Sequence, residues 1–309
     1  MRVGFLLGHS TTPKNRIRGS DLFPVLRTFG LDVDECSPFE EYNFVVCKES
    51  HVDGVARYRT AGSKIILDWS DVIYNENQSH LLKFAKDSDK VVVGTQAHQD
   101  YLEKHKIRSI LIPDGVAYQI PTPVRKELKN LIWYGCHDET LGGMTDLLAL
   151  NSFFREISGC HLTIVSNNVD AYVEVAKSLE IPTTYVPYDP KSFHDVLTRN
   201  DVVIIPYPNS SFVNYKSSNR LLEAMVSGVP VICGASAQNN RMFKSVKDRV
   251  KKDVDFYYTV NDPMEYLDMF DFMRSDIAIT QHFCDVARGY VLQNELIQNR
   301  GYSWAEIFR

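Results

Sequence analysis

Short runs of β-branched and apolar residues alternate with longer amphipathic segments along almost the whole chain. The apolar runs predict strands at 2–7, 31–34, 43–47, 64–67, 91–93, 108–112, 131–134, 162–165, 184–186, 202–205, 229–233 and 255–260. The amphipathic segments predict helices at 20–29, 77–86, 96–104, 144–156, 169–179, 191–199, 221–227 and 237–252, with more helices after 263. A regular alternation of strands and helices predicts an α/β fold with parallel sheets.

The pattern is most informative between 201 and 233. An apolar run at 202–205 is followed by a polar loop, the turn Lys216-Ser217-Ser218-Asn219-Arg220, a short amphipathic helix and a second apolar run. Gly228 ends the helix. This order predicts a βαβ unit, which binds ligands at the carboxyl ends of its strands.

The residue types of this turn predict a site for phosphate and sugar hydroxyls. Ser217, Ser218 and Asn219 are suited to cap the helix, whose first N–H groups and dipole favour an anion. Lys216 and Arg220 add two positive charges, while the carboxylate of Glu223, one turn inside, is suited to accept hydrogen bonds from vicinal hydroxyls. An ordinary capped helix with a solvated Lys/Arg pair explains the same spacing.

The stretch Leu221-Leu222-Glu223-Ala224-Met225, with Gly228, Pro230 and Val231, resembles the donor-binding signature of GT-B glycosyltransferases. Within that family the chain resembles a divergent member of the family-4-like group of retaining, nucleotide-sugar-dependent enzymes. This resemblance implies an α/β GT-B fold with two Rossmann-like domains facing a central cleft. It also implies that Glu223 holds the ribose of a nucleoside diphosphate sugar such as a UDP-sugar, which is a donor substrate and not a cofactor.

The resemblance extends to the domain organisation. The run Ile112-Pro113-Asp114-Gly115-Val116 resembles the segment that closes the first domain of the family, and Tyr302-Ser303-Trp304 resembles its terminal helix. We therefore expect an acceptor-side domain at 1–118 and a nucleotide-sugar-binding domain at 119–288. A terminal helix at 289–309 is expected to cross back to the first domain.

Further donor contacts are expected at strand ends. Gly8 and Arg18 belong to the first loop, which lacks G-x-G-x-x-G, so a dinucleotide cofactor is not expected. Gly135 allows a phosphate to approach closely, and Tyr188 is a candidate for base contact. The predicted donor-binding residues are Gly8, Arg18, Gly135, Tyr188, Lys216, Ser217, Ser218, Asn219, Arg220 and Glu223.

Two polar residues are the catalytic candidates. Lys48 and Asp68 follow the strands at 43–47 and 64–67, where chemistry collects in open α/β sheets. Asp68 is suited to orient or deprotonate an acceptor hydroxyl, and an ordinary loop or cap role is the alternative for both residues. We expect a metal-independent hexosyl- or pentosyltransferase. The pair Asp32 and Asp34 is assigned to a surface strand and not to a metal site.

Three positions depart from the family pattern. Cys136 stands where the family has Arg, and the Lys that should follow is replaced around Leu141-Gly142. Tyr215 stands eight residues before Glu223, where many retaining members have a glutamate. The stereochemical outcome therefore stays open, and a degenerate nucleotide-binding protein without turnover is an alternative.

Composition limits the partners. A net charge of −5 and a pI near 6.0 give no global attraction to nucleic acid or anionic lipid. The expected acceptor is a glycan or glycolipid. A hydroxylated base in DNA, as in some phage enzymes, is the alternative, and basic residues in 237–252 permit peripheral membrane contact. Six scattered cysteines predict buried thiols, and no apolar run spans a membrane, so we expect a cytoplasmic protein.

Overall fold

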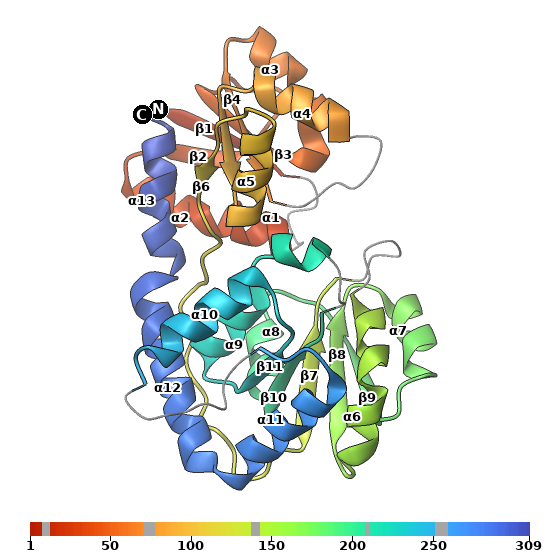
Figure 1. Ribbon diagram of the computed structural model, residues 1–309. Coiled ribbons are helices and arrows are strands. Elements are labelled where there is room, and N and C mark those ends of the chain that lie inside the picture. Colours follow the sequence, from red (N-terminus) through yellow and green to blue (C-terminus); the bar gives the residue numbers. More distant parts are fainter. Residues whose placement is uncertain (8–12, 71–77, 137–142, 208–210, 251–258) are drawn as a thin grey trace. The chain divides into compact units, whose positions relative to one another are not determined.

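The computed structural model describes residues 1–7, 13–70, 78–136, 143–207, 211–250 and 259–309, which form two compact units (Figure 1). Unit 1 contains Met1–Ala117, Asn214–Ser217 and Glu295–Arg309. Unit 2 contains Tyr118–Val213 and Ser218–Asn294. Leu141-Gly142, where the sequence departs from the family pattern, and residues 255–258 of the strand predicted at 255–260 lie outside the described residues.

Unit 1 is built on a six-stranded parallel sheet in the order β2-β1-β3-β4-β5-β6. Its strands are β1 (Arg2–Leu6), β2 (Asp32–Glu35), β3 (Phe44–Lys48), β4 (Lys64–Trp69), β5 (Lys90–Val93) and β6 (Ile110–Leu111). β3 and β4 are buried along almost their whole length, as expected of strands with helices on both faces. β2 alternates instead, with Val33 buried and Asp32 exposed, so the assignment of the Asp pair to a surface strand is confirmed.

Helices cover both faces of this sheet. They are α1 (Pro13–Ile17), η1 (Ser20–Leu22), α2 (Phe23–Thr28), η2 (Glu49–Val55), α3 (Ala56–Thr60), α4 (Gln78–Asp87), α5 (Gln96–Lys104) and α13 (Ile297–Ile307). On one face Leu26 and Trp304 pack on Phe5, and on the other Tyr58 and Leu81 pack on strand residues. The expected return of the terminal helix to the first domain is confirmed, because α13 packs in the core of unit 1.

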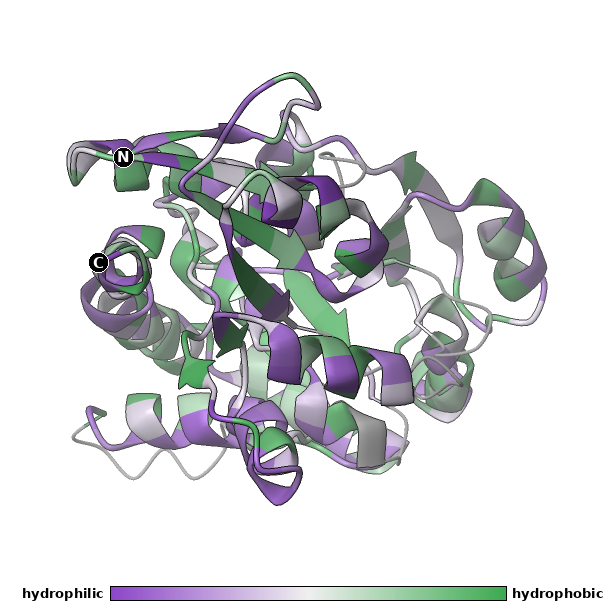
Figure 2. Ribbon diagram, turned by 90° about the horizontal axis from the view of Figure 1, so that it is seen from above, coloured by the Kyte–Doolittle hydropathy of each residue, from purple (hydrophilic) through white to green (hydrophobic). Residues whose placement is uncertain are grey.

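Unit 2 is built on a five-stranded parallel sheet in the order β11-β10-β7-β8-β9. Its strands are β7 (Asn130–Tyr134), β8 (His161–Ser166), β9 (Thr183–Pro187), β10 (Val202–Ile205) and β11 (Val231–Cys233). Its helices are η3 (Met144–Leu150), α6 (Asn151–Glu156), α7 (Val169–Ala176), α8 (Phe193–Thr198), η4 (Ser211–Tyr215, whose last two residues belong to unit 1), α9 (Asn219–Ser227), α10 (Ala237–Lys247), α11 (Pro263–Ser275) and α12 (Ile277–Asn294). Figure 2 shows strands in the middle of the view that are coloured mostly as hydrophobic, and helices in which hydrophobic and hydrophilic residues alternate. The predicted α/β fold with parallel sheets is confirmed.

Candidate donor-binding site

Helix α9 begins where the predicted phosphate turn lies. It runs from Asn219, two residues earlier than predicted, so Asn219 and Arg220 form its first turn. Ser218 is the N-cap residue and is buried. Its hydroxyl caps no backbone N–H and has no hydrogen-bond partner among the described residues. Gly228 ends the helix with φ of 72°, as predicted.

The backbone of Arg220 is tied to the end of β7. The Tyr134 hydroxyl donates to the Arg220 carbonyl oxygen at 2.6 Å. The Arg220 guanidinium carbon lies 5.3 Å from the centre of the Tyr207 ring, a distance at which a cation is attracted to a π face. These contacts hold a positive charge beside the carboxyl end of β7.

Gly135 follows β7 directly. A Cβ atom at this position would lie 3.1 Å from the Trp133 ring and 3.5 Å from Nη1 of Arg220. A side chain would therefore fill the space between the strand end and the guanidinium, while glycine leaves the backbone open to a ligand. The next residue, Cys136, is exposed and forms no disulfide.

Glu223 and Tyr188 lie at the same edge of the sheet. Glu223 is half-buried on α9, and burial together with its nearby charge raises the pKa of Tyr134 well above its ordinary value. Phe193 packs on Tyr134 with ring centres 4.8 Å apart and on Tyr188 at 5.6 Å. The structure thus brings Gly135, Ser218, Asn219, Arg220, Glu223 and Tyr188 to the carboxyl edge of the sheet of unit 2.

The other predicted donor residues lie elsewhere. Lys216 and Ser217 belong to unit 1, in the segment Asn214–Ser217. Gly8 lies outside the described residues. Arg18 also belongs to unit 1, where it is 2% exposed. Its role as a donor ligand stays a prediction.

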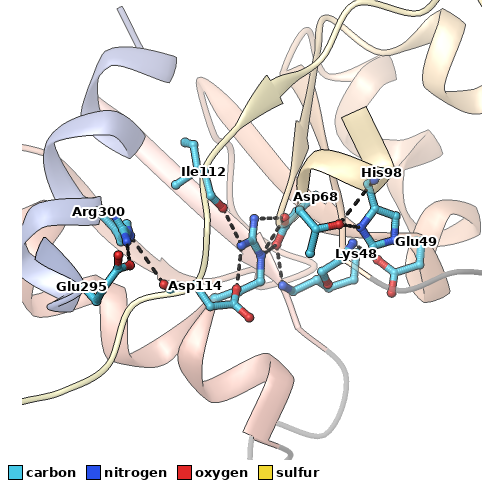
Figure 3. Close-up of polar contacts among 11 residues, drawn as sticks. Lys48, Glu49, Asp68, His98, Ile112, Asp114, Glu295 and Arg300 are labelled. Carbon is cyan, nitrogen blue, oxygen red and sulfur yellow. Dashed lines mark hydrogen bonds and ion pairs between the residues drawn. The ribbon is translucent and has the colours of Figure 1, made fainter. Parts of the chain in front are cut away.

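Arg18 is the centre of a buried ion cluster at the carboxyl edge of the first sheet. Figure 3 shows Asp68, Asp114 and Ile112, which contact Arg18, together with Lys48. The Arg18 guanidinium donates to both carboxylate oxygens of Asp68, the shortest contact being 2.6 Å. Nη1 donates to Asp114 at 2.7 Å and to the carbonyl oxygen of Ile112 at 2.8 Å. The ring of Trp304 lies 5.6 Å from the guanidinium carbon.

The two catalytic candidates both belong to this cluster. Lys48, the last residue of β3, pairs with Asp68 across the parallel ladder, and its ammonium forms an ion pair with the Asp68 carboxylate. Both side chains are buried. Burial acts to raise the pKa of Asp68, but the charges of Arg18 and Lys48 outweigh it and hold the pKa at about 2. The carboxylate is therefore ionised at neutral pH, and its predicted catalytic role stays a prediction.

The position of Asp68 differs from the predicted one. The sequence places it in a loop after 64–67, whereas β4 continues through Trp69. The reason is the ladder to β5, in which Asp68 pairs with Val92 and Trp69 with Val93. Asp68 is consequently a strand residue inside the sheet edge and not a loop residue.

Three residues of these sites were missed in the sequence. Tyr134 is the last residue of an apolar run, so the sequence pattern marks it as a strand residue and gives no sign of the role of its hydroxyl. Tyr207 follows β10 in a Pro-Tyr-Pro run, and this position at a strand end was an available signal. Asp114 was noted only as part of the domain-closing motif, and no local pattern indicates that it faces Arg18, 96 positions earlier.

Among residues that the structure describes, no group of three or more His, Cys, Asp or Glu side chains lies close enough to hold a metal ion. No helix in the same residues is long and apolar enough to cross a bilayer. None of the six cysteines, all of which the structure describes, forms a disulfide. Cys36 is half-buried, Cys136 is exposed, and the other four are buried. The prediction of buried thiols therefore fails at Cys136.

No protein-family profile matches the sequence, and no curated protein matches it. Solved structures do match. HepE of Anabaena, solved with UDP and glucose, has a TM-score of 0.74 and 11% identity over 99% of this chain and 98% of its own. AviGT4, a glycosyltransferase of avilamycin A biosynthesis, has a TM-score of 0.61 and 13% identity over 100% of this chain and 97% of its own.

TarM of S. aureus, in a structure that contains UDP, has a TM-score of 0.65 and 13% identity over 86% of this chain. The match spans 55% of the TarM chain, so this chain covers about half of that relative. At these identities the likeness extends to the fold. The chain therefore has the GT-B glycosyltransferase fold, as the residues around Glu223 predict.

Proposed function

We propose that the protein is a glycosyltransferase that moves a sugar from a nucleoside diphosphate sugar to an acceptor hydroxyl. The observation that carries this proposal is the N-terminus of α9, where the buried Ser218 hydroxyl has no partner among the described residues. Leaving a buried hydroxyl unpaired costs about 1–3 kcal/mol. A phosphate oxygen at this position would accept its hydrogen bond.

The surroundings of Ser218 favour a diphosphate. The first N–H groups of α9 and the helix dipole attract an anion, and Arg220 adds a full positive charge. Lys216 lies two residues before the cap. Gly135 leaves room for a phosphate to approach the end of β7. These groups would stabilise the leaving diphosphate, whose negative charge grows in the transition state, without a metal ion.

The rest of the donor is assigned from the same edge. Glu223, one turn into α9, would accept hydrogen bonds from the ribose hydroxyls, and Tyr188 would contact the base. We propose UDP as the nucleotide, because the HepE and TarM structures both contain it. The transferred sugar is proposed to be a hexose or pentose.

Unit 1 is the proposed acceptor side. Lys48 and Asp68 stand at the carboxyl edge of its sheet, held by Arg18. In the described arrangement both are buried, so we propose that they hold the strand ends that an acceptor hydroxyl of a glycan or glycolipid would approach.

A ligand screen tests the proposal. UDP, GDP, ADP and their sugars are added to the wild-type protein and to the Glu223→Ala variant, and the melting temperature is recorded. A ligand at 100 times its dissociation constant stabilises the folded state by about 2.7 kcal/mol, which raises the melting temperature by a few degrees. We expect this shift with UDP and a UDP-sugar in the wild type and a smaller one in the variant.

The matched control is Glu174→Ala, which removes an exposed carboxylate from α7 of the same unit. It should behave as the wild type. No shift with any nucleotide would refute the proposal. A shift without release of UDP from any UDP-sugar, with acceptors supplied, would instead indicate a nucleotide-binding protein without turnover, and unchanged turnover in EDTA would support metal independence.

A further inference from the structure

The chain leaves unit 2 after Val213 and returns to it at Ser218. The four residues in between, Asn214–Ser217, pack as part of unit 1. They include Lys216 and Ser217, two of the predicted donor-binding residues, and they precede the cap of α9 directly. What holds this segment on unit 1 therefore bears on the donor site.

Within this segment, the ring of Tyr215 packs against the ring of His98. The two ring centres lie 5.2 Å apart, with the planes inclined by 58°. His98 belongs to the first turn of α5 and is 2% exposed. A tilted ring pair at this distance is an attractive packing contact.

Two contacts with Thr95 hold His98 in place. Thr95, the N-cap residue of α5, accepts the His98 backbone N–H at 3.3 Å, and its hydroxyl lies 2.8 Å from Nδ1 of the His98 ring. These two bonds fix both the backbone and the ring of His98. The histidine therefore offers Tyr215 a rigid surface.

Tyr101 lies one turn further along α5. Burial and the nearby Tyr215 hydroxyl raise the pKa of Tyr101. Its ring packs edge-on against Trp69 at 6.1 Å, and its hydroxyl accepts a hydrogen bond from Gln78 at 2.6 Å. Tyr215 is thus packed near two side chains of α5 that are each held by further contacts.

We propose that Tyr215 and His98 form an anchor that positions Lys216 and Ser217 for the donor diphosphate. This inference rests on the proposed function. Only two residues separate the anchor from the Ser218 cap, so fixing Tyr215 removes most of the conformations that these two residues would otherwise sample. Donor binding then avoids the cost of ordering them, which is the usual advantage of a preorganised loop. Both residues act as positioning residues and not as catalytic residues.

The test combines amide hydrogen exchange with donor kinetics in the full-length protein. Tyr215→Ala removes the ring, Tyr215→Phe keeps it, and His98→Ala removes the surface on which it packs. His80→Ala, an exposed histidine of α4 in the same unit, is the control. Circular dichroism verifies folding, and if the buried His98→Ala variant does not fold, Tyr215→Ala decides, because Tyr215 is only half-buried.

In Tyr215→Ala and His98→Ala we expect faster exchange of the peptide that contains 214–217 in the free protein. We also expect the dissociation constant of UDP and the KM of the UDP-sugar to rise about tenfold, equivalent to about 1.4 kcal/mol, with a smaller change in kcat. Tyr215→Phe should stay within about twofold of the wild type, and His80→Ala should match it.

Three results would overturn the inference. Unchanged exchange in Tyr215→Ala would show that the contact anchors nothing. Faster exchange with unchanged UDP affinity would show an anchor without a role in donor binding, and an equal loss in Tyr215→Phe would assign the effect to the hydroxyl. If the wild type binds no nucleotide, the proposed function fails and the donor role fails with it, while the exchange data still report on the packing contact.

Discussion

Arg18, Lys48, Asp68 and Asp114 bring two positive and two negative charges into the interior of unit 1. Burying a charge is costly unless it is paired and hydrogen-bonded, and here Arg18 donates to two carboxylates and a carbonyl oxygen. Because the cluster joins residues from the ends of β3 and β4 to residues beyond β1 and β6, it fixes the carboxyl edge of the sheet. Removing one member would leave a buried partner with fewer hydrogen bonds and a less balanced charge.

Acid titration tests this cluster through Asp68. The folded-state pKa of about 2 lies below the unfolded value of about 3.9, so the ionised carboxylate stabilises the fold above about pH 4. That contribution, about 2 kcal/mol, is lost as the pH falls towards 2. Asp68→Asn should lower the free energy of unfolding by about 3–5 kcal/mol at pH 7.

Urea denaturation of the wild type and Asp68→Asn at several pH values measures both effects. The difference between the two proteins' free energies of unfolding should be constant above about pH 5 and decrease by about 2 kcal/mol towards pH 2. A difference that does not change with pH would contradict the ion-pair account of Asp68.

Glu223 is the residue on which the donor assignment depends most. Charge-assisted hydrogen bonds are worth roughly 1.5–3 kcal/mol each, so losing its contact with the ribose should weaken UDP binding at least tenfold. Glu223→Ala and the control Glu174→Ala are compared by isothermal titration calorimetry with UDP. Equal affinities of the two variants for UDP would show that Glu223 does not contact the nucleotide.

At the scale of single residues, the sequence predicts which residues belong to a site better than it predicts their contacts and burial. Glu223, Gly135 and Ser218 were predicted from a motif and lie together at one sheet edge. Arg18 and Asp68 were predicted at the correct sheet edge, but their pairing joins residues 50 positions apart and leaves no local pattern. Their burial could therefore not be predicted.

Among the elements, α9 shows how single residues set a helix end. At Gly228 the chain has φ of 72°, and a Cβ atom would lie 3.0 Å from the carbonyl oxygen of Thr122. Gly228→Ala should destabilise the protein by about 1–2 kcal/mol or more, because an L side chain is strained in this conformation and the backbone oxygen is close.

Gly289 provides the matched control. It lies inside α12, and a Cβ atom there meets no atom of the described residues within 4 Å. Gly289→Ala should therefore stabilise the protein by up to about 1 kcal/mol, since alanine is the better helix former. The midpoint of urea denaturation measures both the expected loss of stability in Gly228→Ala and the expected gain in Gly289→Ala. A loss at Gly289 as large as that at Gly228 would contradict the role of backbone conformation.

Strands and helices were predicted well where periodicity is strong, and their limits were predicted less well. The strand at 202–205 was predicted with its observed limits. The helix at 20–29 begins as the 3-10 turn η1 before α2, and that at 144–156 divides into η3 and α6. Turns of 3-10 helix are frequent at the ends of α-helices, and the spacing of apolar residues does not distinguish the two kinds of helix.

For the molecule as a whole, the C-terminal segment Glu295–Arg309 completes the core of unit 1. Trp304 is 1% exposed and packs on Phe5 and Phe308, with ring centres 6.0 and 6.4 Å away. Gly115 allows this return, because a Cβ atom there would lie 2.7 Å from the Cα atom of Ile297. Unit 1 is therefore incomplete without the end of the chain.

Trp304→Ala should consequently destabilise unit 1 by about 3–5 kcal/mol, the usual cost of truncating a buried aromatic side chain. Tyr302 on the same helix is 59% exposed, and Tyr302→Ala should cost less than about 1 kcal/mol. The midpoint of urea denaturation measures both. Similar midpoints for the two variants would argue against a core role for α13.

The fold class was predictable because the alternation of strands and helices repeats along the chain, and the return of the terminal helix was predicted from the resemblance of Tyr302-Ser303-Trp304 to a family motif. The assignment of Asn214–Ser217 to unit 1 was not. It depends on Tyr215 meeting His98, 117 positions earlier, and the sequence marks Tyr215 only as a departure from the family pattern.

A crystal structure of the protein with UDP tests the central claim most directly. The account predicts the diphosphate at the N-terminus of α9, within hydrogen-bonding distance of Ser218 and Arg220, and the ribose hydroxyls on Glu223. A nucleotide bound elsewhere, with this helix terminus unoccupied at saturating UDP, would contradict it.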